Sequence, residues 1–215
     1  MSGKPHIMSM DEKMTAGSPT DRIERHKSID RAYHWLMAVA MLILLATAFL
    51  PILGIKFAWV DIHWITGLVL TAIVLFHIIR ASFWQNFWAM MIDSSDLKDP
   101  FAKPGKYSLA QKLYHLAIAV LILAAIVSGL LMWRKVDTPF WQRDPYWLST
   151  DSWGVVYAIH GLAAMALVTM VIIHVYFALR PDEWYLTRSM LRGWITRKEY
   201  QDHHAPRRWP AKDEG

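Results

Sequence analysis

The sequence contains no cysteine. This absence excludes disulfide bonds, thiolate metal sites, iron–sulfur clusters ligated by this chain and the C-x-x-C-H attachment of a c-type haem. Any redox centre must therefore be held by histidine, methionine or another ligand without a thiolate. Because the chain has ten histidines and twelve methionines, a non-covalently bound b-type haem is the natural candidate.

Charged residues are also scarce, at 19% of the chain, and the interiors of its long apolar blocks contain none. Hydrophobic residues make up 54%, above the roughly 45–50% of an average globular protein. The sequence therefore predicts an integral membrane protein rather than a soluble domain. The absence of membrane carboxylates disfavours a small transporter. The net charge of +5 does not indicate a nucleic-acid partner, because the basic residues flank the apolar blocks.

Four apolar segments approach or exceed the roughly 18–20 residues needed to cross a membrane: residues 33–53, 62–79, 113–133 and 155–179. We predict an all-α integral membrane protein, a four-transmembrane-helix bundle spanning residues 28–180. A polar tail of residues 1–27, whose first 25 residues we expect to be disordered, precedes it, and a tail of residues 181–215 follows. Residues 82–91 fit a short interfacial helix and a plain amphipathic connector equally well.

Lysine and arginine mark the two sides of the membrane. Nineteen of the 23 lie in the two tails and in the loop between the second and third segments. Because basic loops stay in the cytoplasm, both termini are predicted to be cytoplasmic. The first thirty residues contain no apolar stretch that resembles a signal peptide, which agrees with this orientation. The loop of residues 136–153 is rich in Trp and Tyr and fits an outer interface or a docking surface.

Six histidines lie in or at the edges of the four segments: His34, His63, His77, His115, His160 and His174. His160 and His174 stand fourteen residues apart in one segment. On a helix, fourteen residues turn about 1400°, roughly 40° short of four turns, and rise about 21 Å. Both imidazoles therefore lie on one face, near opposite sides of a hydrocarbon core about 30 Å thick. Each could ligate a haem, which would give two haems stacked across the membrane.

Axial ligation of haem by two histidines needs imidazoles from different helices at matching depth. On the outer side, the predicted orientation offers one pair, His63 with His160. On the inner side, the candidates for pairing with His174 are His34, His77 and His115. His77 is a serious rival, because it stands fourteen residues from His63, as in the cytochrome b of bc complexes. The alternative for any one of these histidines is a hydrogen bond between helices.

Three glycines lie near histidines or deep in a span. Gly67 follows His63 by one turn, Gly161 adjoins His160, and Gly129 lies deep in the third segment. Small residues would let a flat haem approach the helices closely, and they equally suit ordinary helix packing.

Several motifs follow one another in order along residues 28–209. They are Ser28-Ile29-Asp30-Arg31-Ala32-Tyr33-His34-Trp35, His63-x-x-x-Gly67 with Arg80 closing the helix, Gly105-Lys106-Tyr107 through Gln111-Lys112, Ser128-Gly129 through Trp133-Arg134, the pair His160 and His174, and Gly193-x-Ile195-x-Arg197 followed by His203-His204 and Arg208-Trp209. With these motifs in this order and spacing, the chain resembles the cytochrome b (gamma) subunit of membrane-bound respiratory formate dehydrogenases.

This resemblance implies two haem b groups with their iron held by four histidines. The family's outer haem is ligated from the second and fourth spans, which corresponds to His63 and His160. Its inner haem is ligated from the first and fourth spans, which corresponds to His34 and His174. The resemblance thus favours His34 over His77 as the inner ligand.

The resemblance also implies that a membrane quinone is reduced near the inner haem, beside the start of the third span. Here Ser108 stands where the family has Asn, and Ala110 stands where it has a second Gly. These departures leave the quinone as either menaquinone or ubiquinone. Ser108, Ala110 and Gln111 are the candidate quinone contacts.

The implied partners are an iron–sulfur electron-transfer subunit and a catalytic dehydrogenase subunit with molybdopterin or tungstopterin. The substrate-oxidising site would lie on that other subunit, so we expect no catalytic residue in this chain. The complex, alone or as a higher oligomer, would lie among the lipids of the bacterial inner membrane. Two alternatives stay open: a cytochrome b of a hydrogenase or of another molybdenum or tungsten oxidoreductase, and a haem-free membrane anchor.

Overall fold

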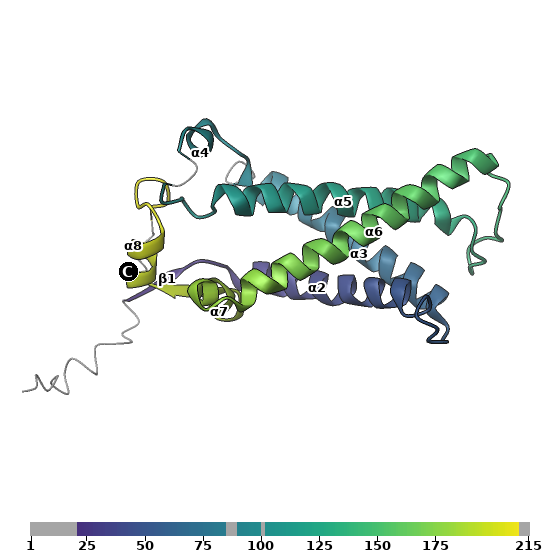
Figure 1. The fold of residues 1–215 in the computed structure, drawn as a ribbon, viewed down its shortest axis with the longest axis horizontal. Helices are drawn as coiled ribbons and strands as arrows, with labels where there is room; N and C mark the ends of the chain where they lie inside the picture. Colours follow the sequence, from purple (N-terminus) through teal and green to yellow (C-terminus); the bar gives the residue numbers. More distant parts are fainter. Residues whose placement is uncertain (1–20, 85–89, 100–101, 211–215) are drawn as a thin grey trace, which may run out of the picture.

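The computed structural model describes residues 21–84, 90–99 and 102–210. In this part of the chain, four helices are long and apolar enough to cross a membrane. They are α2 (Ser28–Phe49), α3 (Trp59–Trp84), α5 (Leu109–Trp133) and α6 (Thr150–Leu179) (Figure 1). With a rise of about 1.5 Å per residue, each exceeds a hydrocarbon core about 30 Å thick. The predicted four-helix membrane bundle is confirmed.

The helix boundaries differ from the predicted spans because hydropathy marks only the apolar part of a helix. The α5 helix begins four residues before its apolar segment, where Ser108 and Gln111 form a capping box. Ser149 caps α6, which begins at Thr150, five residues before the predicted start. The α2 helix ends at Phe49 rather than at residue 53, because Pro51 has no N–H group to continue it. Of the predicted interfacial segment, residues 82–84 continue α3 and residues 85–89 lie outside the described residues.

The four long helices form two hairpins. The α2 helix packs on α3, and α5 packs on α6, whereas the hairpins approach each other chiefly where α3 meets α5. Few apolar residues of the long helices are buried: Ala40, Leu70, Ile73, Ile122, Trp153, Val156, Ala163 and Leu167. The side chains between the hairpins therefore form no dense apolar core.

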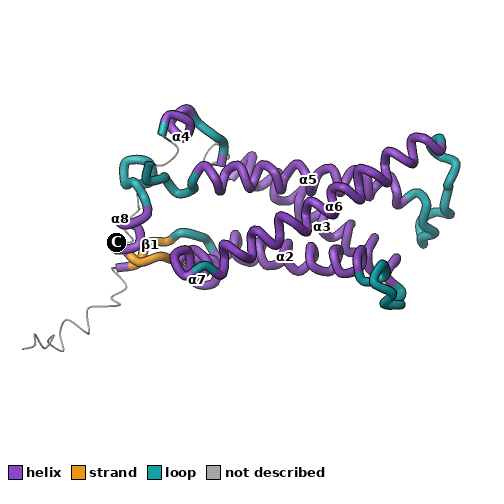
Figure 2. The backbone as a smooth tube through the Cα atoms, viewed as in Figure 1, coloured by secondary structure: helices purple, strands orange, loops and turns teal. Residues whose placement is uncertain are grey.

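The two ends of the bundle differ (Figures 1 and 2). One end, here called the loop end, carries the α2–α3 and α5–α6 connections. There Trp133 packs between Trp64 and Trp141, with ring centroids 5.7 and 4.2 Å away. Trp153 donates to the Pro145 carbonyl at 2.9 Å. These contacts hold the loop that the sequence showed to be rich in Trp and Tyr.

The opposite end, here called the termini end, carries a small cap of short elements. They are β1 (Arg22–Glu24), α4 (Ser94–Lys98), the 3-10 turn η3 (Pro181–Glu183), α7 (Trp184–Arg192), β2 (Trp194–Thr196) and α8 (Arg197–His203). β1 pairs antiparallel with β2, which buries Ile23 and Ile195 against Tyr200. The expectation that the first 25 residues are disordered is wrong for β1, because its pairing partner lies some 170 residues later in the chain.

A buried ion network ties this cap to α5. The Asp96 carboxylate, only 4% exposed, accepts hydrogen bonds of 2.6 Å from the Lys112 ammonium and from the Arg208 guanidinium. Burial pushes the pKa of Asp96 upward, but these bonds outweigh it and hold the pKa below its usual value. The charges compensate one another, as buried charges must.

A second buried group, in the residue that follows β1, contacts the C-terminal segment. Arg25, only 3% exposed, donates to the His204 Nε2 at 2.9 Å and to the Lys106 carbonyl at 2.7 Å. The His204 Nδ1 donates to the Gly105 carbonyl at 2.7 Å, so this imidazole is neutral. Burial, together with the adjacent Arg25 charge, lowers the pKa of His204 to about 4.

We expect acid to loosen the cap through His204. The unfolded residue takes up a proton near its ordinary pKa of 6.5, but the packed imidazole does so only near 4. The stability that it contributes is therefore present above about pH 6.5 and is lost progressively as the pH falls toward 4. Hydrogen-exchange protection factors of residues 194–209 should be lower at pH 5 than at pH 7. His204→Gln should reduce this difference and the neighbouring control His203→Gln should not. Equal protection at both pH values would contradict the expectation.

Candidate functional site

Four of the membrane histidines lie in two facing pairs between the hairpins. His63 on α3 faces His160 on α6, with ring centroids 6.2 Å apart and an interplanar angle of 72°. Nearer the termini end, His34 on α2 faces His174 on α6, with centroids 6.1 Å apart and an angle of 44°. The α6 helix thus contributes one histidine to each pair, as its fourteen-residue spacing predicts.

The separation within each pair fits one metal ion between two imidazoles. Imidazole nitrogens usually lie about 2.0–2.1 Å from a bound metal, so two opposed ligands have centroids roughly 6–6.5 Å apart. In the described residues, no three His, Asp or Glu side chains gather as they would for an ion held by protein alone. A haem fits this donor set, because its macrocycle supplies the in-plane ligands and two imidazoles complete the axial ones.

Hydroxyl groups hold both imidazoles of the loop-end pair. The Thr47 Oγ1 lies 2.7 Å from the His63 Nδ1, and the Ser128 Oγ lies 2.9 Å from the His160 Nδ1. These hydroxyls come from α2 and α5, the two helices that supply no ligand to this pair. Sequence reasoning missed Thr47, although a lone threonine in an apolar run was a signal, and it noted Ser128 only as part of a motif.

The pair at the termini end has a different environment. The His34 Nδ1 is buried and has no hydrogen-bond partner among the described residues. The His174 side chain is exposed, although its ring faces His34. The Tyr114 ring stacks on His174, with ring centroids 5.7 Å apart and an interplanar angle of 23°. Tyr114 is itself fixed, because its hydroxyl donates to the Met170 carbonyl at 2.8 Å.

His77, the rival partner of His174, lies elsewhere. Its ring stacks on Tyr33 at 5.0 Å and faces His115 of α5 at 6.4 Å. Distance alone would admit an ion between His77 and His115 as well. This third pair, however, bridges α3 and α5, where the hairpins are closest and leave the least space for a bulky plate.

The glycines near the loop-end pair differ in their surroundings. A Cβ at Gly129 would lie 3.2 Å from the His160 Cε1, so this glycine makes room for the imidazole. At Gly161 nothing lies within 4 Å, and at Gly67 only Leu44 does, at 4.0 Å. Close helix packing therefore does not account for Gly161.

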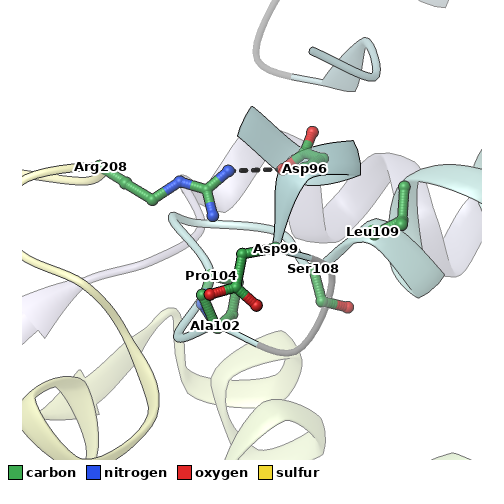
Figure 3. A pocket seen from close by; sticks show the side chains of 7 residues that line it. All are labelled: Asp96, Asp99, Ala102, Pro104, Ser108, Leu109 and Arg208. Carbon is green, nitrogen blue, oxygen red and sulfur yellow. Dashed lines mark hydrogen bonds and ion pairs between the residues drawn. The ribbon is translucent and has the colours of Figure 1, made fainter. Parts of the chain in front are cut away.

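The candidate quinone contacts have structural roles at the start of α5. The Ser108 Oγ accepts from the Gln111 N–H at 3.2 Å, and the Gln111 Oε1 accepts from the Ser108 N–H at 3.0 Å. Ala110 is exposed. The pocket beside Ser108 has a volume of about 20 Å³ and is lined by Asp96, Asp99, Ala102, Pro104, Ser108, Leu109 and Arg208 (Figure 3). It holds about one water molecule and is too small for a quinone head group.

The chain is similar in sequence to three cytochrome b subunits of formate dehydrogenases. The cytochrome b556(fdo) subunit of formate dehydrogenase from Escherichia coli (strain K12) is 26% identical over 213 residues, which cover 88% of this chain and 92% of the relative. The nitrate-inducible cytochrome b556(Fdn) subunit of the same strain is 24% identical over 89% of this chain and 92% of its own length. The cytochrome b556 subunit of formate dehydrogenase from Haemophilus influenzae is 23% identical over 87% and 82%.

These relatives confirm the resemblance that the motifs indicated. A family model described as prokaryotic cytochrome b561 matches residues 25–193, a range that contains all four long helices and all six membrane histidines. The chain therefore belongs to the prokaryotic cytochrome b561 family.

Proposed function

We propose that the chain is the di-haem b membrane subunit of a respiratory dehydrogenase of the formate dehydrogenase type. It would carry electrons from an iron–sulfur partner, through an outer and an inner haem, to a membrane quinone. The observation that carries this proposal is the presence of two facing histidine pairs that share α6, at opposite levels of the bundle. In each pair the two imidazoles are close enough to hold one iron ion between them.

The roles of the histidines follow from their positions. His63 and His160 would be the axial ligands of the haem at the loop end, and His34 and His174 those of the haem at the termini end. Haem iron, when bound, supplies one-electron redox chemistry, and the protein supplies ligation, spacing and electrostatics. The fourteen residues between His160 and His174 separate the two ligation levels by about 21 Å along α6.

The direction of transfer follows from orientation. The basic residues concentrate at the termini end, which supports a cytoplasmic location for both termini. At the loop end, Phe140, Tyr146 and Trp147 are 75%, 91% and 50% exposed, which supports docking of the iron–sulfur subunit there. Electrons would then move inward, from the partner's cluster to the outer and then the inner haem.

The quinone would be reduced beside the inner haem. The exposed His174 ring and its Tyr114 neighbour offer a flat, partly apolar surface there. Gln111 lies one turn before Tyr114 on the same helix. Its side-chain oxygen accepts from the Ser108 N–H, and its side-chain NH2 group could donate hydrogen bonds to a quinone. Reduction of menaquinone or ubiquinone takes two electrons and two protons, and protons taken up at the termini end would come from the cytoplasm. Ser108 and Ala110 would contribute to quinone binding by shaping the protein surface at the start of α5.

The partner enzyme is proposed from the relatives' names. All three relatives are cytochrome b subunits of formate dehydrogenases, so we favour formate over the substrate of a hydrogenase or another oxidoreductase. The catalytic subunit would carry molybdopterin or tungstopterin. A haem-free anchor is disfavoured, because simple packing does not require two histidine pairs at the separation of iron ligands.

A reduced-minus-oxidised visible spectrum of the purified complex tests the cofactor directly. We expect b-type bands with a haem content of two per chain. His63→Ala and His160→Ala should each remove one haem, and it should be the same one, because they are opposite ligands of one iron. A complex without b-type bands would refute the proposal.

Substitutions on α2 and α3 test the inner ligand. His34→Ala should lose the haem that His174→Ala loses, because these two imidazoles face each other. His77→Ala, the control, should keep both haems, because His77 faces His115. Haem content per chain is the measurement, and retention of both haems in His34→Ala would overturn this assignment.

Glycine substitutions test the shape of the outer site. Gly129→Ala should displace the His160 ring, because the new Cβ would lie 3.2 Å from its Cε1. We expect a severalfold weaker retention of the outer haem on dilution in detergent, followed by its absorbance. Gly154→Ala, where nothing lies within 4 Å, is the control and should retain haem like the wild type. Equal retention in both variants would argue against a tight fit at His160.

A further inference from the structure

The two hydroxyls at the loop-end pair have their protons committed elsewhere. The Thr47 hydroxyl donates to the Ile43 carbonyl at 2.8 Å and lies 3.0 Å from the Leu44 carbonyl. The Ser128 hydroxyl donates to the Ala124 carbonyl at 2.6 Å, with Ala125 at 3.2 Å. A hydroxyl has one proton, so each oxygen can only accept from the imidazole beside it.

The directions of these hydrogen bonds determine the tautomer of both imidazoles. Since Thr47 accepts from His63 and Ser128 accepts from His160, the proton of each neutral ring is on Nδ1. The lone pair of each ring is then on Nε2, the nitrogen that remains available for a metal. Two helices that supply no ligand thus hold both rings in the ligating form.

Threonine and serine hydroxyls in membrane helices commonly donate to the carbonyl four residues earlier, so the contact with the imidazole is the informative one. Thr71 makes the same bond to the carbonyl four residues earlier, at 2.7 Å, yet contacts no imidazole through its hydroxyl. Thr47 and Ser128 are each 3% exposed, so water does not compete for their oxygens. The pair at the termini end has no such support, because the His34 Nδ1 has no partner in the described part of the chain.

We infer that Thr47 and Ser128 are positioning residues that hold His63 and His160 in the Nδ1–H tautomer and lower the reduction potential of the outer haem. The inference rests on the proposed function and deepens it. A hydrogen bond from Nδ1–H makes the imidazole a more basic ligand, which favours the ferric over the ferrous iron. The inner haem would lack this effect at His34, so the hydroxyls would help to set the two potentials apart.

Redox titration of the complex in native membranes, followed at the b-type bands, tests this inference. Thr47→Val, which keeps the shape of the side chain, and Ser128→Ala remove one hydroxyl each. Both variants should raise the ratio of ferrous to ferric iron in the same haem about tenfold at a given potential. Tenfold is the lower end of what such hydrogen bonds to a ligand contribute to metal affinity. Tenfold corresponds to about 59 mV for a one-electron couple. The affected haem should be the one that His63→Ala lacks.

Two control variants separate the hydroxyl from the packing. Thr47→Ser keeps the hydroxyl and should keep the wild-type potential, and Thr71→Val removes a hydroxyl that touches no histidine and should change neither potential. If Thr47→Val loses the outer haem altogether while Thr47→Ser retains it with its potential, the positioning role is also supported. Wild-type potentials in Thr47→Val and Ser128→Ala would overturn the inference, as would an equal shift in Thr47→Ser. In that case two haems are still present and the proposed function stands, whereas a wild-type complex without haem overturns both.

Discussion

A polar group inside a bilayer must find its partner within the protein, because no water is present to replace a missing bond. In this chain, six imidazoles lie within the long helices, and they face one another across the space between the two hairpins. Each of three histidine pairs joins one hairpin to the other: α2 to α6, α3 to α6, and α3 to α5. The hairpins share little apolar packing, so the relative position of the helices and the arrangement of the histidines depend on each other.

Different interactions stabilise the two ends of the bundle. At the loop end, tryptophan rings pack on one another, as suits an interface between lipid and water. At the termini end, charges are buried together: Asp96 with Lys112 and Arg208, and Arg25 with the neutral His204. The Asp96 charge is compensated by its two basic partners, and the Arg25 guanidinium is held by hydrogen bonds to His204 and to the Lys106 carbonyl. The cap closes one end of the bundle, beside the pair formed by His34 and His174.

Much of the architecture was predictable, because it depends on the composition and the mean hydropathy of long segments of the chain. Hydropathy gave the four spans, and the absence of cysteine restricted the redox ligands. Helix ends were predicted less well, since capping by Ser108 or Ser149 extends a helix beyond its apolar part. The strand at Arg22–Glu24 was missed for a different reason. Its formation depends on Trp194–Thr196, and no local pattern reveals a partner so distant in the chain.

The sequence by itself determined the number of spans, the donor types available and the depth of each histidine. Depth is a one-dimensional quantity that follows from a constant rise per residue. Which histidine faces which depends on the rotation of each helix and on the packing between helices, and only the tertiary structure decided this. It placed His34 opposite His174 and His77 opposite His115, which depth alone left open. It also brought Thr47 and Ser128 to the loop-end imidazoles from helices that a linear pattern does not connect.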